Sequence, residues 1–153
     1  MRDQQLERAR SAGADLTLNS KNGSPVTAIR EATGRRGVDI AAEFVGLQET
    51  IAQANACHPE RSEGSGGRVV VAGLGPDPIT VLPPTLFVRK ELALLGSYGF
   101  TRRTIEQLVE LVATGKLDLS SSITDTFPLE QVNEGLKVLH EKIGNPIRVV
   151  ITP

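Results

Sequence analysis

Several kinds of residue are scarce in this chain of 153 residues, and each scarcity excludes a class of protein. Tryptophan is absent and aromatic residues make up 3% of the chain, so platforms for stacking nucleic-acid bases are not expected. The single cysteine, Cys57, excludes an internal disulfide and a multi-cysteine metal site. The net charge of -1 creates no field that would attract nucleic acid or an anionic membrane.

Longer patterns are missing as well. No apolar run approaches the roughly 20 residues that cross a bilayer. The opening MRDQQLERAR mixes charges of both signs without an apolar segment, unlike a secretory signal or a transit peptide. The sequence also lacks a Gly-rich phosphate turn, a cluster of His, Cys and Glu, and a nucleophile elbow. We therefore expect a cytoplasmic chain that contacts neither nucleic acid nor membrane and has no catalytic residue of its own.

Apolar runs alternate with amphipathic segments along the chain. Helices are predicted at 3–12, at 25–33, from Gly46, at 101–114 and from Pro128 to 143. The last of these should turn inward Leu129, Val132, Leu136 and Leu139. Strands are predicted at 16–18, 38–44, 68–72, 92–95, 123–127 and 147–151. This alternation predicts an α/β fold with a doubly wound parallel sheet, the strands near 38, 68, 92 and 147 in its body, and a ligand edge where the strands end.

Residues 56–67, ACHPERSEGSGG, interrupt the alternation. They are polar and rich in glycine and serine, which indicates an exposed inserted loop in an otherwise single domain, 1–153. The string HPERSEGS resembles the translation of a bacterial repetitive DNA element. Cys57 and His58 are adjacent, and adjacent residues rarely converge on one metal ion, so a solvated loop is favoured over a metal site.

Five segments together carry a resemblance: ERARSAGAD, FVG after a strand, GGRVVVAGLG, LLGSYGFTRRTIEQLVELVATGKL and FPLEQVNEGLKVLHEKIGNPIRVVITP. In order and spacing they resemble the C-terminal part of the medium-chain dehydrogenase/reductase superfamily, in particular its zinc-type alcohol dehydrogenases. The resemblance covers nearly the whole chain apart from 56–65. It implies an incomplete Rossmann-like sheet that lacks the first βαβ unit. It also implies NAD or NADP as cofactor and zinc ligands in a missing N-terminal domain. Aligning residues 11–14 with the family places its ribose-binding acid just before Met1, so Met1 is interpreted as an internal residue of a longer sequence.

The resemblance also implies cofactor contacts after three strands, at Val45, Gly46, Ala72, Gly73, Leu74, Gly96, Ser97 and Tyr98. The family places adenosine at the first turn, the nicotinamide carboxamide at the second, and nicotinamide with the dimer edge at the third. Each position has a plainer interpretation. Gly46 could simply start a helix, Gly73 could make a turn, and Tyr98 could belong to the core or an interface.

Arg148, in the final strand, matches a family arginine that pairs with the cofactor pyrophosphate. A guanidinium suits phosphate because its planar fork offers paired donors. The alternative is a surface charge near Glu134 or Glu141.

Two functions stay open. The first is the cofactor-binding portion of an NAD(P)-dependent oxidoreductase, which meets its small alcohol or aldehyde substrate only in the intact enzyme. The second is a non-catalytic, truncated or decayed fragment that at most forms a homo-oligomer through its sheet edge. In either case we expect the chain alone to bind no cofactor, because it lacks the helix N-terminus that holds the pyrophosphate.

Overall fold

The computed structural model describes residues 3–59 and 66–153. The chain divides into two compact units, Met1–Tyr98 and Gly99–Pro153. Within the described residues, no helix combines the length and the apolar character that a membrane span requires.

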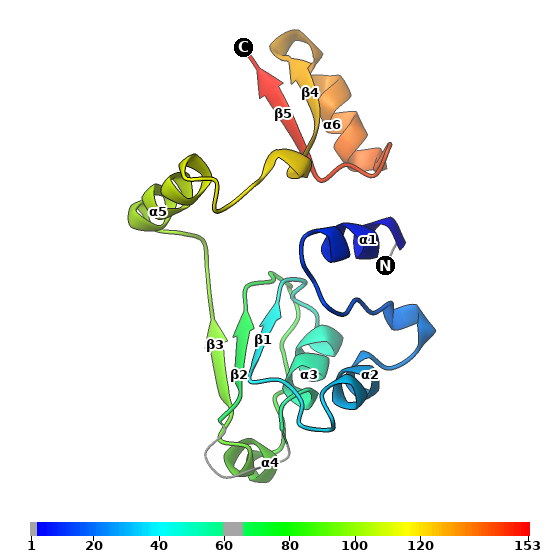
Figure 1. The fold of residues 1–153 in the computed structure, drawn as a ribbon, viewed down its shortest axis with the longest axis vertical. Coiled ribbons are helices and arrows are strands. Elements are labelled where there is room, and N and C mark those ends of the chain that lie inside the picture. The colour runs from blue at the N-terminus through cyan, green and yellow to red at the C-terminus, as the bar shows by residue number, and fades with distance from the viewer. Residues whose placement is uncertain (1–2, 60–65) are drawn as a thin grey trace. The chain divides into compact units, whose positions relative to one another are not determined.

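The first unit is built on a three-stranded parallel sheet. Its strands are β1 (Ile40–Glu43), β2 (Arg68–Val71) and β3 (Ala93–Gly96), in the order β1-β2-β3. Their arrows point the same way in Figure 1, and Val69 lies between Ala41 and Leu94 in the register. The mixed α/β class with parallel strands is therefore confirmed. All three carboxyl ends lie at one edge because the strands pair in parallel.

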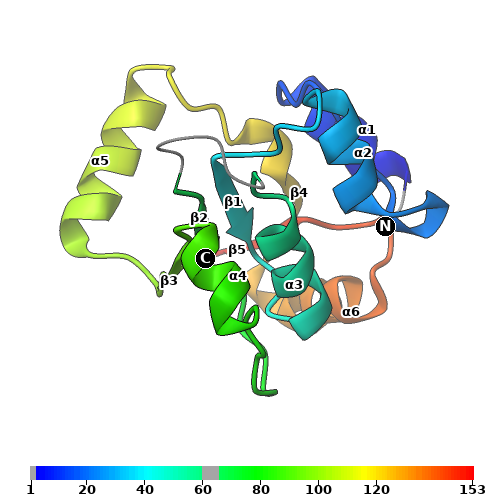
Figure 2. The ribbon, with the colours of Figure 1, turned by 90° about the horizontal axis from the view of Figure 1, so that it is seen from below.

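Helix α3 (Gln48–Ala56) packs on β1 and β2, and Ile51 of the helix and Val69 of β2 are both buried. The helix lies beside β1 in both Figure 1 and Figure 2. Helix α2 (Pro25–Ala32) packs on α3, and the predicted start is confirmed, since the Ser24 hydroxyl accepts from the Thr27 amide at 3.4 Å. The remaining elements of the unit are α1 (Asp3–Ser11), η1 (Ser20–Asn22) and α4 (Pro84–Arg89).

The second unit is a smaller α/β unit of its own. It contains α5 (Arg102–Ala113), η2 (Ser120–Ser122), β4 (Ile123–Pro128), η3 (Leu129–Gln131), α6 (Val132–Glu141) and β5 (Arg148–Thr152). Strands β4 and β5 pair in parallel, and α6 packs on both. The predicted cap of α5 is confirmed, because the Thr101 hydroxyl accepts from the Thr104 amide at 3.2 Å.

Four predictions about the elements are wrong. Residues 16–18 form no strand, since no described strand lies beside them to complete a ladder. The strand near 147 pairs with β4 in a separate two-stranded sheet, because α6 is the crossover that brings β5 beside it. Helix α3 begins at Gln48, after a turn in which Gly46 has φ of +82°. The helix predicted from Pro128 begins as η3 and becomes α-helical only at Val132.

The inward face of α6 was predicted correctly only in part. Val132 is half-buried, whereas Leu129, Leu136 and Leu139 are exposed and Gly135 is buried. A Cβ placed on Gly135 would lie 3.1 Å from Ile151 Cδ1 and 3.2 Å from Val149 Cγ1. The helix therefore approaches the β4–β5 sheet through a residue with no side chain.

The two ends of the polar segment 56–67 are buried, against the prediction of a solvated loop. Cys57, His58, Pro59 and Gly67 are all buried, and His58 is 1% exposed. The His58 ring fills the space where a Gly67 side chain would stand, 2.3 Å from the Cβ position to Nδ1. Residues 60–65 lie outside the described part of the chain.

Candidate functional site

Eight of the nine predicted site residues lie together, at the carboxyl ends of the three parallel strands. Val45 and Gly46 follow β1, Ala72 to Leu74 follow β2, and Gly96 to Tyr98 end and follow β3. We call the turns at 44–47 and 72–76, together with residues 96–98, the rim. Parallel α/β sheets bind ligands outside the carboxyl ends of their strands, so the rim is where the fold itself predicts a site.

The two turns of the rim touch each other through backbone alone. A Cβ on Gly46 would lie 2.5 Å from the carbonyl carbon of Leu74, and a Cβ on Gly73 would lie 2.1 Å from the Gly46 nitrogen. A Cβ on Gly75 would likewise overlap the Gly46 carbonyl oxygen. These glycines are therefore required for the turns to pack, whatever ligand lies above them.

Glu43, the last residue of β1, holds both turns. Its carboxylate accepts from the Val45 amide at 2.7 Å, from the Gly46 amide at 2.9 and 3.0 Å, and from the Thr50 hydroxyl at 2.7 Å. Its backbone carbonyl accepts from the amides of Ala72 at 2.8 Å and Gly73 at 3.1 Å. One residue thereby satisfies four amides, two in each turn.

Glu43 is 4% exposed, yet its carboxylate is held in the charged form because its pKa is lowered. Burial raises the pKa of Glu43. The hydrogen bonds from Thr50, Gly46 and Val45 lower it by more, so the pKa lies below the ordinary value of 4.5. Sequence reasoning missed this residue. The available signal was a carboxylate within the apolar run VDIAAEF, three residues before a glycine.

A second side-chain contact fixes the loop that follows β2. The Gln48 amide group donates to the Thr80 carbonyl at 3.1 Å and accepts from the Thr80 amide at 2.5 Å. This pair imitates one rung of a β-ladder and anchors the loop to the first turn of α3.

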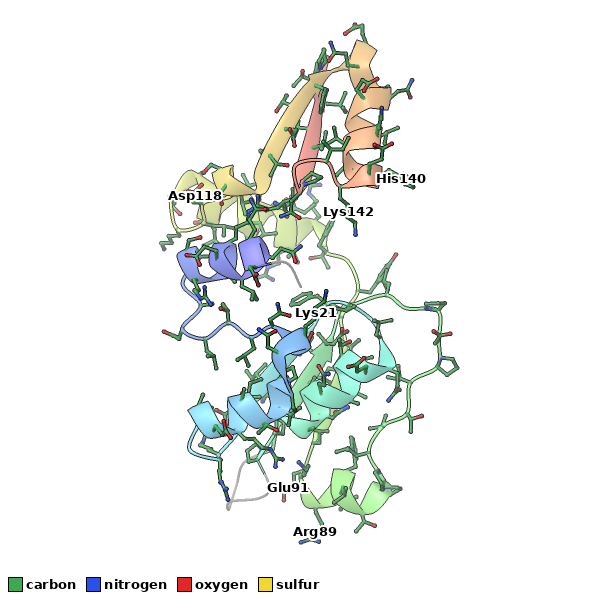
Figure 3. All side chains as sticks on the ribbon, turned by 90° about the vertical axis from the view of Figure 1, so that its right-hand side faces the viewer. Lys21, Arg89, Glu91, Asp118, His140 and Lys142 are labelled. Atoms are coloured by element: carbon green, nitrogen blue, oxygen red, sulfur yellow. The ribbon has the colours of Figure 1, made fainter. Side chains whose placement is uncertain are left out.

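The rim exposes apolar side chains. Val45 is 55% exposed, Leu74 78% and Tyr98 87%. An open groove of about 430 Å³ runs beside β1 and is lined by Ile29, Val38 and Phe44 as well as by Val45. Charged residues such as Arg89 and Glu91 lie at the α4 end of the unit, where β3 begins (Figure 3). The rim therefore fits an uncharged, flat portion of a ligand better than a phosphate.

Arg148, the ninth predicted residue, belongs to the second unit. It is exposed and donates to the Ser122 hydroxyl at 2.6 Å. The second unit also presents His140 on α6, as the sequence predicted, and it is exposed (Figure 3).

A buried polar cluster that the sequence did not predict fastens the end of α3. The His58 Nδ1 lies 2.7 Å from the Val38 carbonyl, and Lys90 Nζ donates to the His58 carbonyl at 3.3 Å. His58 Nε2 is buried without a partner. Burial lowers the pKa of His58 below 6.5, and burial raises the pKa of the neighbouring Cys57 thiol above 9.0. Both groups are therefore neutral and structural.

The metal that the resemblance implies does not fit this chain's described residues. Across 3–59 and 66–153, no group of three or more His, Cys, Asp and Glu side chains is placed to hold an ion. A zinc site normally needs at least three protein ligands.

Comparison with known proteins gives a consistent result. Residues 1–114 match the family described as zinc-binding dehydrogenase. The L-threonine 3-dehydrogenase of Bacillus velezensis is 29% identical over 99% of this chain and 42% of its own length. The NAD-dependent alcohol dehydrogenase of Saccharolobus solfataricus is 27% identical over 97% of the chain and 41% of its own length.

A solved structure agrees. The alcohol dehydrogenase TADH from Thermus sp. ATN1 superposes with a TM-score of 0.86 at 26% identity, over 97% of this chain and 41% of that one. This chain thus spans about two fifths of the length of the relatives it matches, in their C-terminal portion. With most of its length inside the family match and its sheet superposing on such an enzyme, the chain belongs to the zinc-binding dehydrogenase family.

Proposed function

We propose that this chain is the C-terminal, cofactor-binding portion of an NAD(P)-dependent zinc-type alcohol dehydrogenase-like oxidoreductase. The observation that carries the proposal is the rim, where two glycine turns and exposed apolar side chains gather at the carboxyl edge of a parallel sheet. A relative over nearly the whole chain is named an NAD-dependent alcohol dehydrogenase, which supports a nicotinamide cofactor. The substrate class is a small alcohol or aldehyde, oxidised or reduced only where zinc ligands are supplied from outside the described residues.

In this proposal the chain alone binds no cofactor measurably. The rim amides of Val45, Gly46, Ala72 and Gly73 already donate to Glu43 and are not free to hold a pyrophosphate. Arg148 could supply one charge-assisted contact, worth about 1.5–3 kcal/mol. A micromolar complex needs about 8 kcal/mol.

The second candidate is a non-catalytic fragment that associates with itself. Among the described strands, β1 and β3 each have one neighbour, and Ile40 in β1 and Phe44 directly after it are exposed. Unpaired apolar edges of this kind favour association between copies. A concentration-dependent mass without any gain of cofactor binding would favour this candidate.

The test compares the chain alone with a chimera. In the chimera, this chain follows the part of the Thermus alcohol dehydrogenase that precedes the matched region. NADH and NADPH binding is followed by calorimetry, with no binding expected for the chain and micromolar binding for the chimera. Arg148→Ala in the chimera should weaken binding about ten- to a hundredfold, whereas the exposed Arg103→Ala should not change it. A folded chimera that binds neither nucleotide would refute the proposal, and micromolar NADH binding by the chain alone would refute the expected dependence on a preceding half.

A further inference from the structure

Glu43 is an unusual residue to find beneath a ligand-binding edge. It is a carboxylate, it is 4% exposed, and it ends the edge strand β1. The groups that donate to it are two backbone amides and the Thr50 hydroxyl, all of them uncharged. A buried charge is costly unless hydrogen bonds satisfy it, so its position depends on the turn, and the turn depends on it.

The same residue connects the first turn to the second. The Glu43 carbonyl accepts from Ala72 and Gly73, so its main chain holds the β2 turn while its side chain holds the β1 turn. The turns interlock, with the Gly73 Cβ position 2.1 Å from the Gly46 nitrogen. A displacement of one turn must therefore displace the other.

We propose that Glu43 is a positioning residue for the cofactor. Its carboxylate draws in the amides of Val45 and Gly46, its carbonyl draws in those of Ala72 and Gly73, and together they set the shape of the rim. This inference rests on the proposed function for the identity of the ligand, though not for the geometry. The same arrangement makes the rim select between ligand groups. Its four amides already donate to Glu43 and a negative charge lies beneath them, so the rim repels phosphate and accepts an uncharged ring.

The test uses the 153-residue chain labelled with ¹⁵N and follows individual amides by NMR. The variant Glu43→Gln keeps the size of the side chain and removes its charge. We expect exchange at Val45 and Gly46 to accelerate about ten- to a hundredfold, as for loss of hydrogen bonds to a charged group. We expect their amide protons to shift upfield, because a carboxylate acceptor deshields more than an amide does. The amides of β2 should change much less.

Two further variants complete the design. Glu43→Asp keeps the charge but shortens the side chain, and it should show the same site-limited loss of protection even if Glu43→Gln fails to fold. Glu106→Gln makes the same chemical change in the exposed pair with Arg102, 2.9 Å apart, and should leave the rim untouched. Inorganic phosphate in large excess should move none of the four rim amides in the unmodified chain.

The opposing outcomes are equally specific. If Glu43→Gln leaves Val45 and Gly46 protected, if Glu43→Asp behaves as the unmodified chain, or if β2 and the rim lose protection alike, Glu43 does not position the turns. Phosphate-induced shifts at the rim amides would overturn the selectivity. None of these measurements includes a nucleotide, so the chimera's failure to bind NADH would refute the proposed function and leave this result standing.

Discussion

The interlocked turns predict how much each of four glycine-to-alanine substitutions in the first unit should lower the free energy of unfolding. Gly46 has both a positive φ, +82°, and a blocked Cβ position, whereas Gly73 has only the blocked position. Gly34 has only the positive φ, +58°, with nothing within 4 Å of its Cβ, and Gly96 has neither. The set therefore separates backbone strain from steric overlap within one sheet and its helices.

The expected magnitudes follow from these two costs. A left-handed conformation costs a residue with a Cβ about 1–2 kcal/mol, and forcing atoms into a packed site costs about 1–3 kcal/mol. The free energy of unfolding should fall by about 1 kcal/mol in Gly34→Ala, about 1–3 kcal/mol in Gly73→Ala and about 2–5 kcal/mol in Gly46→Ala. Gly96→Ala should stay within about 0.5 kcal/mol of the unmodified chain.

Urea unfolding followed by far-ultraviolet circular dichroism measures the ranking, because the chain has no tryptophan to report by fluorescence. Gly46 and Gly73 touch, so the double variant should lose less than the sum of the two single losses. A loss at Gly46 no larger than that at Gly34 would refute the close approach of the turns.

Two more predictions concern packing elsewhere. His58, with its pKa lowered by burial, is neutral in the fold and takes up a proton more readily when unfolded. The contribution of His58 to the free energy of unfolding should therefore be fully present well above pH 6.5 and be lost as the pH falls below 6.5. His58→Asn should reduce that loss while the exposed His140→Gln does not, and an unchanged slope in His58→Asn would contradict the burial. Gly135→Val should destabilise the second unit by about 1–3 kcal/mol more than the exposed Lys137→Val, measured by thermal melts. Equal losses at 135 and 137 would show that α6 does not approach its sheet through Gly135.

The sequence by itself determined the positions of most elements. The run GGRVVVAGLG predicted β2, Thr101 predicted the start of α5, and Ser24 with Pro25 predicted the start of α2. These signals are local: a cap, a proline or an apolar run acts within a few residues of itself, so it can be read without the rest of the fold. For the same reason the three groups of rim residues could be predicted to meet at one sheet edge, since parallel strands end together.

Only the tertiary structure decided what holds that edge and what is buried behind it. Glu43 joins the two turns because the amides of Ala72 and Gly73, nearly thirty residues later in the chain, donate to its carbonyl. His58 is buried because Val38, Gly67 and Lys90 meet around it from three separate segments. Gly135 marks the inner face of α6 although it has no side chain to give a hydrophobic signal. In each case the outcome depends on contacts between segments distant in sequence, and such contacts leave no trace in local spacing.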